Sequence, residues 1–158
     1  MRVRELAESI NLDETDIQIL EILQENCKLN YTQIGNELGI AESTIRYRIE
    51  RLEKRRIING YVALINPRMV GLNITAIMMI KINPQMIKEI SPKLAAFKEL
   101  RHLFRSTGQY DMISVVNARD IGHLNDVMGE IKQIEGIHEL IVEVATQLVK
   151  VDPKFSLR

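Results

Sequence analysis

Hydroxyl, guanidinium and phenol side chains recur between residues 43 and 54, at spacings suited to the outer side of one helix. Short hydroxyls reach phosphates or base edges, and a tyrosine ring packs against a thymine methyl. Arginine binds phosphates and pairs with guanine through two hydrogen bonds. The residues that we predict to contact DNA on these grounds are Ser43, Thr44, Arg46, Tyr47, Arg48, Arg51 and Lys54.

Apolar residues of the same segment predict the helices that position these side chains. Ile45, Ile49 and Leu52 recur at helical spacing and form a buried stripe. The residues opposite that stripe are Ser43, Tyr47, Glu50 and Lys54, whereas Arg48 lies nearer the buried edge. A shorter apolar stripe precedes Gly39, a residue that commonly ends helices. The pattern is typical of a helix-turn-helix, although a solvated amphipathic helix in a bundle remains an alternative.

Size and composition are those of a soluble globular protein, with 158 residues, 46% apolar and 27% charged. The net charge is zero, but six basic residues outnumber three acidic ones between positions 41 and 60. One patch with an excess of three charges should bind DNA weakly, so we expect a dimer or a larger assembly. Cys27 is the single cysteine, which excludes an intrachain disulfide, and the three histidines lack metal-ligand spacing.

No leader or membrane segment is expected. The residues at the N-terminus alternate charged and apolar types, unlike a secretory signal. The longest apolar run covers residues 76–80, too short to cross a bilayer. We therefore expect a cytoplasmic protein.

The first part of the chain, residues 1–60, is predicted to be a helix-turn-helix (winged-helix-like) domain. A short helix is expected over residues 3–10, and Asp13 and Asn30 are predicted to cap the next two helices. Residues 56–65 alternate like a strand leaving the domain. Residues 61–73 are predicted to be a strand linker.

The remaining residues, 74–158, predict an alternating order of strands and helices. Strands are expected over 74–82, 100–107, 110–117 and 137–151, and helices over 84–97, disturbed near Pro92, and 120–135. This β-α-β-β-α-β order is ferredoxin-like, so the fold class is α+β. Both faces of the first and last strands are apolar, which favours sheet-to-sheet dimerisation. The alternative is that the linker or the N-terminal helix covers the second face.

With both halves placed, the chain resembles the Lrp/AsnC (leucine-responsive/asparagine regulator, or feast/famine) family of transcription regulators. Three segments carry the resemblance: LDETDIQILEILQEN, YTQIGNELGIAESTIRYRIERLEKRRIINGYVALINPRMVGL and STGQYDMISVV. It implies an N-terminal helix-turn-helix, a strand linker and a C-terminal ligand-sensing domain. It also implies dimers that commonly assemble to octamers or other higher oligomers, and in many members an amino-acid effector bound between dimers.

The resemblance places the effector beside one turn, formed by Thr107, Gly108, Gln109, Tyr110 and Asp111. Glycine would let a ligand carboxylate approach backbone N–H groups, and Asp111 would accept hydrogen bonds from an ammonium. On the residues alone, the same segment is an ordinary hairpin turn. No other cofactor and no metal are expected.

The chain departs from the family in two places. Ala41 stands where members usually have a serine that caps the recognition helix, and residues 1–11 form a longer lead-in than many members have. Loss of a cap typically costs about 1 kcal/mol.

The predicted function is a sequence-specific regulator of transcription that binds double-stranded DNA. The alternative is an architectural protein that bends or wraps DNA without a specific effector. A helix-turn-helix that binds protein is disfavoured by its basic, hydroxyl-bearing face. We expect no enzyme, because no nucleophile with its base, phosphate-binding glycine loop or metal motif occurs in the sequence.

Overall fold

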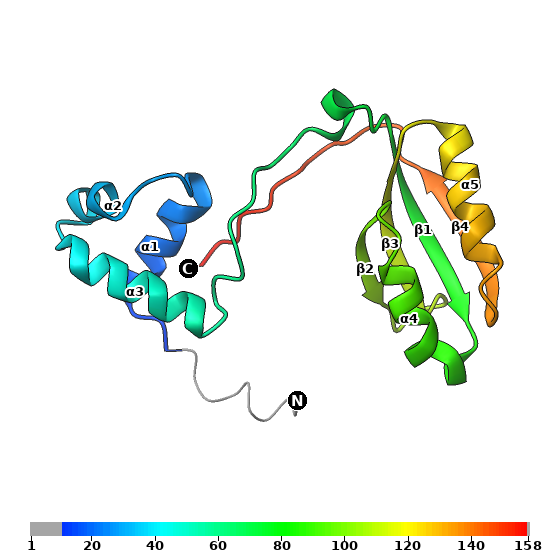
Figure 1. The fold of residues 1–158 in the computed structure, drawn as a ribbon, viewed down its shortest axis with the longest axis horizontal. Helices are drawn as coiled ribbons and strands as arrows, with labels where there is room; N and C mark the ends of the chain where they lie inside the picture. The colour runs from blue at the N-terminus through cyan, green and yellow to red at the C-terminus, as the bar shows by residue number, and fades with distance from the viewer. Residues whose placement is uncertain (1–10, 158) are drawn as a thin grey trace. The chain divides into compact units, whose positions relative to one another are not determined.

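A computed structural model describes residues 11–157 and divides them into two compact units. Unit 1 contains the chain up to Ala63 together with the tail from Val151, and unit 2 runs from Leu64 to Lys150. The element order of each unit can be followed in Figure 1. The tail was expected to belong to the second domain. It groups with unit 1 because Phe155 and Lys154 bond to the first helix.

Unit 1 is a three-helix bundle of α1 (Glu14–Glu25), α2 (Tyr31–Leu38) and α3 (Glu42–Lys54). Asp13 and Asn30 cap α1 and α2 as predicted, and each forms a reciprocal capping box with the third helical residue. The fully or almost fully buried core contains Ile19, Ile34, Ile45, Ile49 and Leu52. The stripes predicted for α2 and α3 therefore supply four of these five residues, whereas Ile19 of α1 was not among the predicted stripe residues.

The turn between α2 and α3 depends on two glycines. Gly39 ends α2 in the left-handed region with φ of 68°, a conformation that costs glycine little. Gly35 lies so close to the turn that an added Cβ would stand 2.5 Å from the carbonyl oxygen of Ile40. Ile40 also donates its own N–H to the carbonyl oxygen of Gly35, at 2.8 Å. Close backbone approach thus fixes where α3 begins.

Unit 2 is a four-stranded antiparallel sheet with two helices. The strands are β1 (Ile74–Ile82), β2 (Leu100–Arg105), β3 (Met112–Ala118) and β4 (Ile137–Val144). Their spatial order is β2-β3-β1-β4, so the central strands are the first and third. The helices are α4 (Ile87–Ala95) and α5 (Ile121–Lys132), and two short 3₁₀ turns, η2 (Pro67–Val70) and η3 (Pro84–Met86), precede β1 and α4. This arrangement confirms the predicted β-α-β-β-α-β order.

One face of the sheet carries the core of unit 2. Alternate residues of β1, from Ala76 to Ile82, are buried with apolar residues of both helices. The opposite face is also apolar, because Ile77, Met79 and Val115 point there, but these side chains are only half-buried. The second apolar face predicted from the sequence is therefore present.

Several predicted elements end elsewhere in the structure. Residues 56–58 lie in the turn that follows α3, with Arg56 in the left-handed region at a φ of 56°, and no residue from 56 to 65 belongs to a strand of the described chain. Strand β4 stops at Val144 instead of 151. The reason at β4 is that its partner β1 begins at Ile74, so pairing ends with the bond from Ala145 N–H to Thr75 O at 2.8 Å. Helix α4 runs through Pro92 to Ala95, shorter than predicted. The helix expected over residues 3–10 lies outside the described residues.

Candidate nucleic-acid interface and effector turn

The outer side of α3 carries exposed polar and aromatic groups. Ser43, Thr44 and Lys54 are exposed, and Tyr47 keeps 64% of its surface accessible. The buried stripe of Ile45, Ile49 and Leu52 fixes this orientation, because side chains on opposite sides of a helix cannot both face a core. Ala41 makes no side-chain cap bond, because a methyl group cannot accept a hydrogen bond. The helix thus presents an exposed polar and aromatic surface opposite its buried stripe.

Arg46 is exposed but has neighbours from its own helix and from α2. Its Nη2 donates to Glu42 Oε1 at 3.2 Å, and its guanidinium carbon lies 5.1 Å from the centre of the Tyr31 ring. Thr32 donates to the other oxygen of Glu42 at 2.6 Å. The Thr32 hydroxyl, and then Arg46, hold the pKa of Glu42 below its ordinary value. Arg46 keeps 54% of its side chain accessible and stays available to phosphate.

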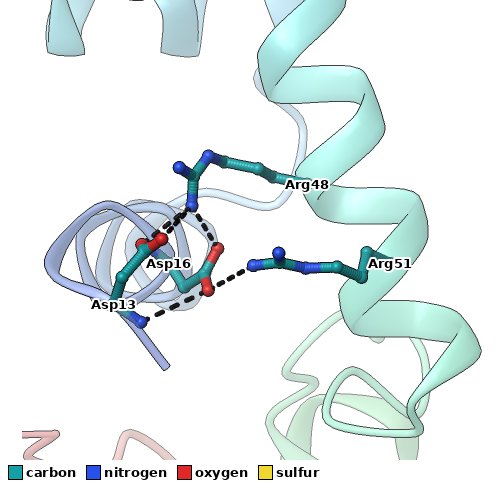
Figure 2. Close-up of polar contacts among 4 residues, drawn as sticks. All are labelled: Asp13, Asp16, Arg48 and Arg51. Carbon is teal, nitrogen blue, oxygen red and sulfur yellow. Dashed lines mark hydrogen bonds and ion pairs between the residues drawn. The ribbon is translucent and has the colours of Figure 1, made fainter. Parts of the chain in front are cut away.

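Arg48 and Arg51 lie differently, because both reach from α3 to the start of α1 (Figure 2). Nη1 of Arg48 donates to both oxygens of Asp13, at 2.8 and 2.6 Å, and to Oδ1 of Asp16 at 2.9 Å. Nη2 of Arg51 donates to Oδ2 of Asp16 at 2.6 Å. Asp16 is fully buried, whereas Asp13 is exposed. Two predicted DNA contacts are therefore bonded to carboxylates within unit 1.

Hydrogen bonds shift the pKa values of this cluster in opposite directions. The side-chain bond from Arg48, followed by the bond from the Asp16 backbone, holds the pKa of Asp13 below its ordinary value. The same bond to Asp13, followed by that to Asp16, raises the pKa of Arg48. Both shifts favour the charged pair.

Sequence reasoning missed the acidic side of this cluster. It assigned Asp13 to the N-cap of α1 and connected neither Asp13 nor Asp16 to α3. A signal was present, since helical spacing placed Arg48 near the buried edge of its helix. The contribution of Tyr31 beside Arg46 was also missed, because it depends on how α2 packs on α3.

The predicted effector turn joins β2 to β3. Thr107, Gly108 and Gln109 are exposed, and the backbone N–H of Gly108 donates to Ser106 Oγ at 3.1 Å. The φ of Gly108 lies outside the left-handed region, and an added Cβ would meet only Ser106 Oγ, at an ordinary contact distance of 3.5 Å. The turn therefore has room for a small side chain at Gly108.

The next two residues tie the turn to the rest of the sheet. The carboxylate of Asp111 accepts the N–H of Ile82 at 2.8 Å, and its own N–H donates to Ile80 O at 3.0 Å. The Tyr110 hydroxyl donates to Glu139 Oε1 at 3.5 Å, and burial followed by Glu139 raises its pKa. Asp111 thus holds β1 beside β3, a structural role that the sequence did not indicate.

Within residues 11–157, no group of three or more potential ligands lies placed to hold a metal ion. In the same part of the chain, no helix is long and apolar enough to cross a membrane.

The fold and the two candidate sites define a regulator with a DNA-binding helix-turn-helix and a separate ligand-binding domain. An AsnC-type helix-turn-helix domain matches residues 12–53, and an Lrp/AsnC ligand-binding domain matches residues 75–155. The chain belongs to the Lrp/AsnC family of transcription regulators.

Curated relatives match most of the chain. It is 37% identical to the HTH-type transcriptional regulator FL11 of Pyrococcus furiosus, over 83% of this chain and 89% of the relative. It is 33% identical to the HTH-type transcriptional regulator LrpA of Pyrococcus horikoshii, over 88% of this chain and 99% of the relative.

Solved structures share the fold. Escherichia coli AsnC has a TM-score of 0.84 and 24% identity, with 90% of this chain and 97% of AsnC covered. A transcriptional regulator of Neisseria meningitidis, solved as an L-Met complex, has a TM-score of 0.87 and 23% identity, with 93% and 97% covered.

Proposed function

We propose that this regulator recognises operator DNA through the outer side of α3. The direct contacts are assigned to Ser43, Thr44, Arg46, Tyr47 and Lys54. The observation that carries this assignment is the exposure of these side chains opposite the buried stripe of α3. Phosphate contacts supply affinity that depends on salt, and base-edge contacts supply the choice of sequence. The chain acts by binding and not by catalysis.

A dimer is the proposed binding unit, with higher assembly up to the octamer built from it. One helix with a small excess of positive charge contacts few phosphates, whereas two copies read two half-sites of a pseudo-palindrome. The half-buried apolar face of the unit 2 sheet supports pairing of two such sheets. About 800 Å² buried per partner is typical of a stable interface.

The DNA proposal is tested by selecting duplexes from a random pool and measuring their affinity by fluorescence anisotropy at several salt concentrations. We expect the selected duplex to bind about 10³-fold or more tightly than a scrambled duplex. Arg46→Gln should reduce the salt slope by about one unit, because one phosphate contact is lost. Lys88→Gln, an exposed charge on α4, is the control and should leave the slope unchanged. Equal affinity for all sequences at matched salt would refute specific recognition and favour an architectural role.

We also propose that an amino acid binds at the turn of residues 107–111 and shifts the equilibrium between assembly states. The L-Met complex of the Neisseria protein, which shares the fold, supports this class of ligand. The exposure of Gly108 supports the place, since a ligand carboxylate has no side chain to avoid there. An effector acts only to the extent that its affinities for the two states differ.

The effector proposal is tested by calorimetric titration of each of the proteinogenic amino acids. We expect at least one to bind, and Gly108→Ala to weaken that binding about tenfold or more, because the methyl group covers the backbone. Gly108→Ala should leave the melting temperature unchanged, since its Cβ makes only an ordinary contact. Gly129→Ala, on the exposed side of α5, is the matched control. Equal binding by the Gly108 variant would move the site elsewhere.

A further inference from the structure

Arg48 and Arg51 reach from α3 to the start of α1, where they bond to Asp13 and Asp16 (Figure 2). The carboxylate of Asp16 accepts Arg48 on one oxygen at 2.9 Å and Arg51 on the other at 2.6 Å. Asp16 is thus clamped between two arginines of the recognition helix.

Burial makes this clamp necessary for the fold of unit 1. Asp16 has no accessible surface, and an ionised carboxylate without partners is strongly disfavoured away from water. Removing one partner of a buried ion pair leaves the other charge uncompensated. Both arginines therefore have a reason to stay at Asp16 that is independent of DNA.

One terminal nitrogen of each arginine is directed to the carboxylates of Asp13 and Asp16. Nη1 of Arg48 is shared among three carboxylate oxygens, and the side chain is only 22% accessible. Nε of Arg51 is buried without a hydrogen-bond partner among the described residues. A guanidinium whose Nε is enclosed has fewer donors left for a phosphate.

We propose that Arg48 and Arg51 are positioning residues, which fix the recognition helix to α1 through Asp16, and that they are not phosphate contacts. The proposal rests on the proposed function, because it deepens the assignment of the DNA-binding side of α3. The positively charged contacts to DNA are then left to Arg46 and Lys54, together with Arg55 and Arg56. All four are exposed, and Arg46 pairs with Glu42 of its own helix.

The charge available to DNA is correspondingly smaller than the sequence suggests. The local excess of three positive charges between residues 41 and 60 falls to one when the two carboxylates of α1 are counted. A small excess makes affinity depend on the correct placement of a few contacts. Placement of α3 by Asp16 then controls binding without adding to the phosphate contacts.

Asp16→Asn separates the two roles, because it changes a residue that lies under α3 and keeps its shape. If Arg48 and Arg51 position the helix, operator affinity falls about tenfold while the salt slope stays at its wild-type value. Discrimination against the scrambled duplex should fall as well. If the arginines are phosphate contacts that Asp16 restrains, freeing them tightens binding and steepens the slope by about one unit for each arginine. Tighter binding, a steeper slope or unchanged affinity would each overturn the proposal.

A pair of substitutions provides a rescue test in case a single variant unfolds unit 1. Arg51→Met and Asp16→Leu should each lower the melting temperature and the affinity. The double variant replaces the buried pair by apolar groups, an exchange that is often neutral or stabilising, while Arg48 keeps its bonds to Asp13. We expect it to recover both the melting temperature and the operator affinity, with the wild-type slope. Recovered folding with affinity still low and a slope reduced by about one would identify Arg51 as a DNA contact and overturn the proposal.

Arg46→Gln serves as the reference for a true phosphate contact in the same titrations. It should lower the slope and leave the melting temperature near wild type. The wild-type protein tests the proposed function separately: if it does not prefer the selected duplex, recognition by α3 fails. If wild type discriminates and the Asp16 variants behave as contact variants do, only the positioning role fails.

Discussion

Asp13 serves two structural purposes with one carboxylate. Its Oδ1 caps α1 by accepting the N–H of Asp16 at 2.9 Å, and both oxygens accept Arg48 from α3. An exposed carboxylate held in this way connects the start of one helix to the middle of another. Its protonation would weaken both connections at once.

We expect acid to remove the stabilisation that Asp13 provides. The pKa of Asp13 in the folded chain lies below its ordinary value of 3.8, chiefly because Arg48 donates to it. A depressed folded-state pKa means that stabilisation is present above the unfolded value and disappears as pH falls through the folded value. The difference in melting temperature between wild type and Asp13→Asn should be constant from pH 5 to 7, values that lie above 3.8, and should shrink below it. A difference that persists unchanged into strong acid would show that ionisation of Asp13 does not stabilise the fold.

Ala41 leaves the recognition helix without a side-chain cap, and a suitable residue there should stabilise unit 1. Its ψ of 139° is extended, and Glu42 is the acidic residue in the first turn of α3. Ala41→Thr supplies a hydroxyl for the free N–H groups and should add about 1 kcal/mol, or about 4–8 °C in the melting temperature of a small domain. Ala41→Val has the same shape without the hydroxyl and is the control. An equal rise in both variants would attribute the effect to packing.

At the scale of elements, the sequence predicted the helix caps, the helix-ending glycine and the first strand, because short stretches of sequence determine these features. The caps Asp13 and Asn30, the left-handed Gly39 and the whole of β1 agree with the sequence interpretation. The end of β4 could not be predicted, because its apolar alternation continues while its partner strand does not.

In the candidate site as well, features set by one helix were predictable and features set by packing between elements were not. Helical periodicity predicted which residues of α3 face outward, such as Tyr47, since that depends on the core stripe alone. It could not predict that Arg48 and Arg51 meet Asp13 and Asp16, because that depends on how α1 packs across α3. Asp111 shows the same limit, since its bond to Ile82 requires the register between two strands.

The turn of the helix-turn-helix should be intolerant of a methyl group at Gly35. An alanine Cβ would lie 2.5 Å from the carbonyl oxygen of Ile40, which is backbone and cannot rotate away. Gly35→Ala should therefore destabilise unit 1 by about 1–3 kcal/mol, although alanine is the better helix former. In Gly129→Ala nothing lies within 4 Å of the new Cβ, so that control should gain up to about 1 kcal/mol. Urea unfolding measures both. A Gly35 variant as stable as wild type would mean that the turn adjusts without cost.

At the scale of the whole molecule, the chain passes between the two units twice. It leaves unit 1 after Ala63 and returns to it at Val151. The returning tail is held by Gln24, whose Oε1 accepts the N–H of Phe155 at 2.6 Å and whose Nε2 donates to the Phe155 oxygen at 3.2 Å. Lys154 adds an ion pair with Glu25 at 2.6 Å. The final residues therefore belong structurally to the helices of unit 1.

We expect Gln24 to account for most of the hold on this tail. Its amide bonds to both the backbone N–H and the backbone C=O of Phe155, and each such bond contributes about 1 kcal/mol when its partners are well placed. The Lys154–Glu25 pair is exposed and should be screened by salt. Gln24→Ala should therefore increase amide hydrogen exchange in the last turns of α1 and in the tail about fivefold or more, the factor that corresponds to about 1 kcal/mol.

The control is Lys154→Ala, which leaves the hydrogen bonds between Gln24 and the Phe155 backbone in place. It should change exchange little at moderate salt. Removing residues 153–158 should reproduce the effect of Gln24→Ala and add little to it in the combined variant, because both remove the same contact. Additive effects would show that Gln24 stabilises α1 independently of the tail.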